Sequence, residues 1–197
     1  NGPDSLLAAQ ATYCAEDQEK YWEYHNELYK NWAGEKTGWI TRESLDKFAT
    51  VVRKELLKAN LIPGVVKFIN SLNESNLSCF VNSGSDEKEL IQIFSVKGIS
   101  DLFKGIFGSP ATKVENTKKI LDLMGDKKYL FFGDSKSDYL SAKEFDIDFI
   151  FVDGFSEWEN YKVNKGDFLT QIHDFSLLRV WYFNSLEMID SSLLDQN

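Results

Sequence analysis

Short apolar runs alternate with helix-forming stretches through the middle of this 197-residue chain, and this alternation constrains its fold more than any other feature. The apolar runs predict strands at residues 77–81, 106–107, 129–132 and 149–152. Amphipathic stretches between them predict helices at residues 86–94, 112–124 and 135–145. Strands and helices that alternate over short turns favour a Rossmann-like α/β fold, built on a doubly wound parallel sheet.

The residues on either side of this alternation predict helices. Helical patterns begin at a cap formed by Asp4, continue over about residues 17–32, and begin again at Thr41. Pro63 then starts the core at a position where a helix tolerates proline. We therefore expect a helical N-terminal region, an α/β core and a helical tail, over residues 1–60, 61–178 and 179–197 respectively.

Within residues 17–32, four ring-bearing side chains recur at helical spacing, namely Trp22, His25, Tyr29 and Trp32. Residues three or four apart lie on one face of a helix, and an aromatic face of this kind is typical of a packed surface. We therefore interpret His25 as a packed, hydrogen-bonded residue and not as a ligand.

Charge and cysteine content exclude several classes of protein. The net charge of −9 disfavours nucleic acid as a partner, because binding a polyanion needs clustered Lys and Arg. No apolar run approaches the roughly 18 residues that a membrane helix needs, so we expect no membrane partner. Cys14 and Cys79 form no C-x-x-C pair, and we interpret both as small buried residues of a cytoplasmic protein.

The chain begins at Asn1 without an initiator methionine or signal segment, which is typical of a processed product or a fragment.

The strongest local signal is the segment from Phe131 to Asp138, which reads Phe-Phe-Gly-Asp-Ser-Lys-Ser-Asp. An apolar strand ends at Asp134, and Asp138 falls in the first turn of the next helix. Two carboxylates at that point suit Mg²⁺, which takes one or two carboxylates together with water and a substrate phosphate. Helix capping explains the same residues, because Asp and Ser at a helix start accept hydrogen bonds from its first amides.

Two further groups follow predicted strands. Ser83 and Gly84 offer a hydroxyl and backbone amides that could cradle a phosphate, although an ordinary polar turn has the same composition. Lys113 lies at the start of a predicted helix, where a positive charge is unfavourable for the helix dipole. A phosphoryl group beside carboxylates would explain that lysine, and so would simple solvation of its side chain.

The order of these groups resembles a known family. Ser83, then Lys113, then the Gly-Asp-x-x-x-Asp segment ending at Asp138, each stand at the end of a successive strand. This order is similar to the second, third and fourth motifs of the haloacid dehalogenase-like (HAD) hydrolases. The resemblance extends over about residues 61–153, which is somewhat under half of the chain.

The resemblance implies a role for each matched residue. Ser83 and Gly84 would bind the phosphoryl group of a small phosphorylated molecule, and Lys113 would be catalytic by stabilising its charge. Asp134 and Asp138 would hold or orient Mg²⁺ as the cofactor. The helices of residues 1–60 would stand where this family carries its cap.

The family also needs an Asp-x-Asp motif after a first, central strand, because its first carboxylate attacks phosphorus. Residues 1–60 contain no such motif. Asp146 and Asp148 precede their strand, and Asp153 follows its strand but has Phe155 where the second aspartate would stand. The nucleophile is therefore unknown. Without a central strand, the sheet would have to close up, recruit another strand or self-associate through its unpaired edge.

A second resemblance covers the N-terminal helices. Residues 4–49, including the segment Gly38-Trp39-Ile40, are similar to the helical insertion of DsbA-like thioredoxin-fold proteins. In that family the redox C-x-x-C lies upstream, and this chain has none, so Cys14 would be structural. A helical piece of one family joined to the core of another suggests a chimeric or truncated chain.

Three hypotheses for the function follow. The first is a HAD-like phosphohydrolase that uses Mg²⁺ and is impaired by the missing nucleophile motif. The second is a non-catalytic protein that retains the phosphate and metal site. The third and weakest is a thiol oxidoreductase fragment, suggested only by residues 4–49.

Overall fold

The computed structural model describes residues 3–17, 21–34 and 37–178 of the chain. These residues are α/β in class, as predicted, and divide into two compact units. The first unit contains residues 1–60, 83–100 and 108–110, and the second contains the remainder. The expected helical tail over residues 179–197 lies outside the described residues. Among the residues described, no helix is long and apolar enough to cross a membrane.

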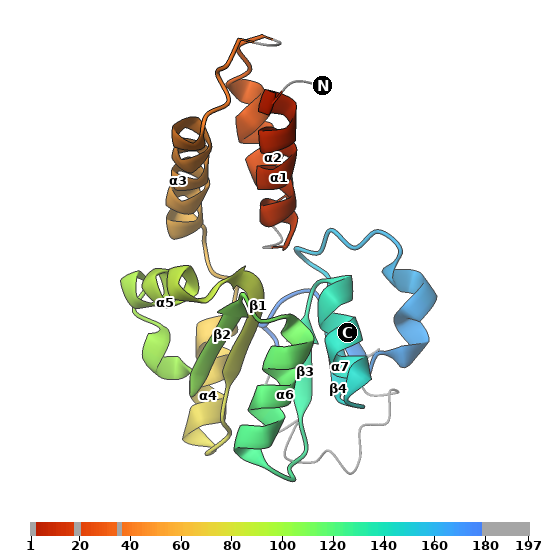
Figure 1. The fold of residues 1–197 in the computed structure, drawn as a ribbon. Coiled ribbons are helices and arrows are strands. Elements are labelled where there is room, and N and C mark those ends of the chain that lie inside the picture. The colour runs from red at the N-terminus through yellow and green to blue at the C-terminus, as the bar shows by residue number, and fades with distance from the viewer. Residues whose placement is uncertain (1–2, 18–20, 35–36, 179–197) are drawn as a thin grey trace. The chain divides into compact units, whose positions relative to one another are not determined.

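The first unit is mainly helical. It contains α1 (Pro3–Asp17), α2 (Tyr21–Lys30), α3 (Arg42–Lys58) and α5 (Glu87–Val96), coloured red to green in Figure 1. Thr41 caps α3 through a reciprocal pair of hydrogen bonds with Ser44, so the predicted helix start is confirmed. A core cluster joins α1, α2 and α3 through Ala15, Tyr24, Leu28, Leu45 and Phe48. An ion pair between Arg53 and Glu89 links α3 to α5.

The aromatic face predicted on α2 is not the face that packs against α1 and α3. Tyr24 and Leu28 are buried, whereas the side chains of Trp22, Tyr29 and Trp32 are more than half exposed. The rings instead stack on one another, with His25 between Tyr21 and Tyr29. His25 is packed as expected, but among the residues that the structure describes its buried Nδ1 has no hydrogen-bond partner. The expectation for this face was wrong because α2 carries aromatic residues on both sides, so spacing alone does not identify the inner one.

The second unit contains a three-stranded sheet with the order β3-β4-β5. Its strands are β3 (Leu130–Gly133), β4 (Asp148–Val152) and β5 (Thr170–Ile172), and both pairs are parallel, as predicted for the core. β4 is the central strand, and its residues Phe149 to Val152 are buried. α7 (Lys136–Glu144) packs on β3 and β4. The helix α4 (Val65–Glu74) contributes Phe68 to a cluster with Val152 and Phe175.

A separate two-stranded sheet pairs β1 (Phe80–Asp86) with β2 (Gly105–Ser109). The described strands therefore form two sheets and not one continuous sheet. β1 ends later than predicted, so the expected turn at Ser83 and Gly84 lies inside the strand. Gly108 explains this extension, because a β-carbon there would lie 2.4 Å from the Ser85 carbonyl oxygen, and its absence lets the two backbones approach closely. Asp86 caps α5, as expected for the following helix.

The remaining elements include three that the sequence patterns did not predict. α6 (Lys113–Met124) begins and ends where expected, at Thr112 and Gly125. β5 and the 3-10 helix Tyr161–Asp167 were not predicted, and a further 3-10 turn covers Ser100–Leu102. Cys79 is half-buried, and burial raises the pKa of its thiol, which lowers the thiolate fraction. The side chain of Cys14 lies outside the described part of the structure.

Candidate phosphate and metal site

The site is built at the junction of β3 and α7. β3 ends at Gly133, Asp134 follows it, and Ser135 is the N-cap of α7. The Ser135 hydroxyl accepts a hydrogen bond from the Asp138 amide at 3.2 Å, and the Asp138 carboxylate accepts one from the Ser135 amide at 3.1 Å. Helix capping by these residues, one of the two sequence interpretations, is therefore confirmed.

Asp138 is buried and accepts hydrogen bonds at both carboxylate oxygens. Oδ2 accepts from the amides of Asp134 and Ser135 and from the Ser135 hydroxyl, at 3.2, 3.1 and 2.8 Å. Oδ1 accepts from the Lys113 ammonium group at 2.8 Å. Asp138 therefore holds the turn at Asp134 and Ser135 through Oδ2, and it holds Lys113 through Oδ1.

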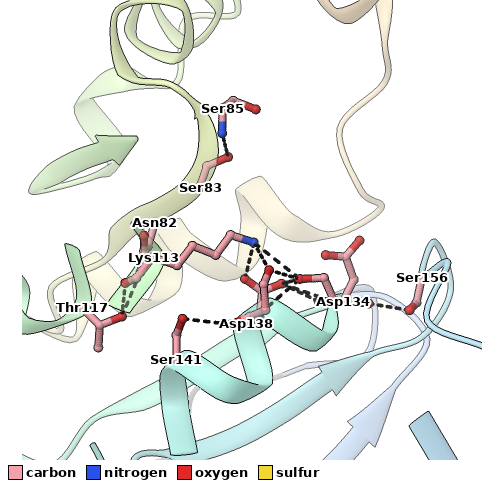
Figure 2. Close-up of polar contacts among 11 residues, drawn as sticks. Asn82, Ser83, Ser85, Lys113, Thr117, Asp134, Asp138, Ser141 and Ser156 are labelled. Carbon is pink, nitrogen blue, oxygen red and sulfur yellow. Dashed lines mark hydrogen bonds and ion pairs between the residues drawn. The ribbon is translucent and has the colours of Figure 1, made fainter. Parts of the chain in front are cut away.

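Lys113 is not a solvated lysine. Its side chain is only 9% exposed and forms the ion pair with Asp138 that Figure 2 shows. The same nitrogen also donates to the Ser137 hydroxyl at 3.0 Å. Asn82 fixes the start of α6, because its side-chain amide donates to the Lys113 carbonyl oxygen at 2.8 Å and to Thr117 at 2.9 Å. The site thus holds a buried positive charge in a defined position.

Asp134 differs from Asp138 because its side chain is exposed. It follows β3 at the carboxyl edge of a parallel sheet, where α/β proteins collect their ligands. A hydrogen bond joins the loop after β4 to Asp134, since the Ser156 hydroxyl donates to the Asp134 carbonyl oxygen. Ser156 in turn accepts from the Trp158 amide at 3.1 Å. Sequence analysis missed Ser156 because no motif marks this loop.

Ser83 and Gly84 belong to the first unit and are described with it. The Ser83 hydroxyl accepts a hydrogen bond from the Ser85 amide at 3.2 Å, as Figure 2 shows. Their proposed contribution to phosphate binding stays a prediction from the sequence. Lys113, Asp134 and Asp138, by contrast, lie together within the second unit.

Asp153, the sequence alternative for a nucleophile, has its carboxylate engaged by two side chains. The Gln171 amide donates to one oxygen, and Nδ1 of His173 lies 3.3 Å from the other. Sequence analysis did not find this cluster, because Gln171 and His173 are in or next to a strand too short and polar to be recognised.

The donor groups at the β3–α7 junction fit Mg²⁺ better than a transition metal. The described residues contain no group of three or more His, Cys, Asp or Glu side chains that could hold a metal ion. Mg²⁺ does not need one, because it keeps several waters and uses one or two carboxylates plus substrate phosphate. Asp134 offers an exposed carboxylate, while Asp138 is already saturated at Oδ2.

Comparison with known proteins gives a family match. The family model for haloacid dehalogenase-like hydrolase matches residues 8–152 of this chain. This match includes the N-terminal helices as well as the α/β core. A search of curated protein sequences finds none that matches.

Solved structures agree with this match at the level of the fold. A haloacid dehalogenase-like family hydrolase from Streptococcus pneumoniae has 16% identity and a TM-score of 0.60, with 94% of this chain and 92% of that chain covered. A β-phosphoglucomutase from Clostridium difficile has 16% identity and a TM-score of 0.59, with 86% and 74% covered. YfnB from Bacillus subtilis, assigned to the HAD hydrolases and solved bound to magnesium, has 15% identity and a TM-score of 0.52, with 94% and 93% covered.

Proposed function

The chain belongs to the haloacid dehalogenase-like hydrolase family, and on this premise we propose that it binds a small phosphorylated molecule together with Mg²⁺. The observation that carries the proposal is the buried Lys113 beside an exposed Asp134 at the carboxyl edge of the sheet. A fixed cation next to a carboxylate suits a phosphoryl group and its metal ion. The magnesium held by YfnB from Bacillus subtilis supports the choice of metal.

Each residue has a separate part in this proposal. Lys113 neutralises the charge of the phosphoryl group, and Asp134 supplies a carboxylate to Mg²⁺. Asp138 is a positioning residue, since its oxygens accept from Lys113 and from the Asp134 turn. When bound, the metal ion would neutralise further charge on the phosphate oxygens. That Ser83 and Gly84 donate hydrogen bonds to a phosphoryl group stays a prediction from the sequence.

We further propose that hydrolysis by these 197 residues is impaired. Residues 1–60 contain no Asp-x-Asp motif, and the carboxylate of Asp153 is held by Gln171 and His173. Loss of a nucleophile removes orders of magnitude in rate but leaves binding contacts in place. We therefore expect the chain to bind phosphate and metal even though its hydrolytic activity is impaired.

The test measures binding and turnover on the same protein. Mg²⁺ and inorganic phosphate should together raise the melting temperature of the chain, and Asp134→Asn should remove that shift. Asp122→Asn, an aspartate exposed on α6, is the matched control and should leave it unchanged. Mg²⁺-dependent hydrolysis of an aryl phosphate should be weak or absent. An unshifted melting temperature would overturn the binding proposal, and rapid turnover abolished by Asp134→Asn would overturn the impairment.

A purely non-catalytic binding protein is the second candidate, and the missing Asp-x-Asp motif favours it. It predicts the same shift in melting temperature with no turnover at any Mg²⁺ concentration. A thiol oxidoreductase is a weaker alternative, supported only by the resemblance of residues 4–49. It predicts insulin reduction that is lost when Cys14 and Cys79 are both replaced by serine, and the raised pKa of the Cys79 thiol disfavours it.

A further inference from the structure

The helix α5 holds the end of α3 at two points, and all of these contacts lie within the first unit. Near the start of α5, the Glu89 carboxylate pairs with Arg53. At its end, the Lys97 ammonium group donates to the carbonyl oxygens of Leu57 and Ala59, at 3.0 and 2.6 Å. α3 and α5 are therefore joined through side chains at both ends of α5 (Figure 1).

The contact made by Lys97 is the stronger of the two. The last four carbonyl groups of a helix have no partner within it, and a cation beside them is favourable. Lys97 supplies two hydrogen bonds and a positive charge at the end of α3, and it is half-buried. The Arg53 side chain, by contrast, is 52% exposed, and an exposed ion pair contributes little to stability. Lys97 therefore decides how firmly α5 holds α3.

The start of α5 follows directly after Ser83 and Gly84, where the sequence predicts phosphate binding. Asp86 caps α5, and its carboxylate accepts a hydrogen bond from the Glu89 amide at 2.9 Å. Glu89 is also the residue that pairs with Arg53, so the cap and the contact to α3 share one residue. α5 is 10 residues long, and a helix of this length spans only about 15 Å. A short helix of this kind transmits a displacement of one end to the other.

We propose that α5 couples the end of β1 to the end of α3, and that Lys97 is the latch that closes this link. A shift at Ser83 or Gly84 is transmitted along α5 and changes the stability of the last turn of α3. This coupling is a property of the first unit alone. Its use, in reporting a bound phosphoryl group to the helices of residues 1–60, rests on the proposed function.

Hydrogen exchange at the end of α3 tests the coupling without a ligand. The reporter is the Ala59 amide, which donates to the carbonyl oxygens of Glu55 and Leu56. Asp86→Ala removes the cap of α5 and should accelerate exchange of this amide about fivefold. Lys97→Met removes two hydrogen bonds and should accelerate it about tenfold. Asp86→Ala added to Lys97→Met should give no further acceleration, because the latch is already open.

Two variants and a second amide serve as controls. Asp86→Asn should leave the Ala59 amide at the wild-type rate, because asparagine caps a helix about as well as aspartate. Lys97→Arg keeps a charged donor and should retain the response to Asp86→Ala. The Leu28 amide in α2 reports unfolding of the whole helical core and should exchange at the wild-type rate in every variant. Equal acceleration at Leu28 and Ala59, or an equal effect of Asp86→Ala with and without Lys97, overturns the coupling.

A second measurement adds Mg²⁺ and inorganic phosphate to the full chain. Together they should slow exchange of the Ala59 amide in the wild type and leave it unchanged in Lys97→Met, while both proteins show the same rise in melting temperature. A rise in melting temperature without slower exchange overturns the reporting of the ligand to α3. No rise in either protein overturns the proposed function instead, and the ligand-free experiment still decides whether α5 couples its two ends.

Discussion

A β-carbon on Gly133 would lie 2.3 Å from the β-carbon of Asp138 and 2.8 Å from its Oδ2. Glycine before Asp134 is therefore a steric requirement, because the Asp138 side chain occupies the space that any other residue would need. The glycine of the Gly-Asp-x-x-x-Asp pattern is thus required by a packing contact, in addition to the two carboxylates that the pattern supplies.

Gly133→Ala should destabilise the second unit and disturb the site. Overpacking of this kind typically costs about 1–3 kcal/mol, and the Asp138 carboxylate would lose its alignment with the amides of Asp134 and Ser135. Urea denaturation measures the cost. Gly166→Ala is the control, because a β-carbon there meets no atom within 4 Å. Equal stabilities of the two variants would contradict the steric argument.

The ion pair between Lys113 and Asp138 should be strongly coupled. Both side chains are less than a tenth exposed, so Lys113→Met or Asp138→Asn alone leaves a buried charge without its partner. Each single change is expected to cost roughly 3 kcal/mol, and the double variant should cost much less than the sum. Lys143→Met with Asp167→Asn is the control cycle, because the side chains of Lys143 and Asp167 are 60% and 49% exposed. Additive costs at the buried pair would show that the two charges do not stabilise each other.

The sequence was sufficient to predict the order of strands and helices in the core. The apolar residues of β3 and β4 are followed directly by polar turns, and parallel strands bring such turns to one edge. Lys113 and Asp138 could be predicted as part of one site for this reason. Their ion pair could not, because it joins residues 25 apart and depends on how α6 packs against α7.

Other features depend on contacts that no local pattern records. The strand Thr170–Ile172 has three residues and is held by pairing with β4, so His173 and its contact to Asp153 could not be placed from the sequence. The aromatic side chains of α2 were assigned to the wrong face. The small side chain of Ala15 in α1 packs with Tyr24 of α2 in the helical core. Contact with the neighbouring helix therefore decides which face of α2 is buried.

Gly64 lies close to the backbone of the segment that follows β5, and substitution of this glycine tests how tightly the two pack. It has a φ of +79°, and a β-carbon there would lie 2.4 Å from the Phe175 carbonyl carbon. Gly98 has a similar φ of +67° but open space around it. Gly64→Ala and Gly98→Ala therefore share the backbone strain, and only the first adds a clash with the backbone. We expect Gly64→Ala to lower the free energy of unfolding by about 1–3 kcal/mol more than Gly98→Ala. Equal losses in urea denaturation would mean that the Phe175 segment moves away without cost.

The link between α7 and the loop before β5 should make stability depend on pH in acid. The Tyr139 hydroxyl and the Lys143 ammonium group both donate to Asp167, and they hold the pKa of its carboxyl below the usual value of 3.8. Hydrogen bonds from the Lys143 ammonium group to the Tyr139 hydroxyl and to Asp167 raise the pKa of Lys143. A carboxyl whose pKa is lower in the folded protein contributes stability above its unfolded pKa. That contribution is lost as the pH falls through the folded pKa.

Asp167→Asn should therefore lower the melting temperature near pH 6 and have a smaller effect near pH 2, because the stability contributed by the ionised carboxylate decreases as the pH falls below the unfolded pKa. The stability that Lys143 gains has the opposite dependence, because its raised pKa makes it persist until strongly basic pH. Melting temperatures measured from pH 2 to pH 7 check the first statement. Asp122→Asn, on the exposed surface of α6, is the matched control and should follow the wild-type curve. A constant difference between Asp167→Asn and wild type across this range would mean that the carboxyl contributes through its shape and not through its charge.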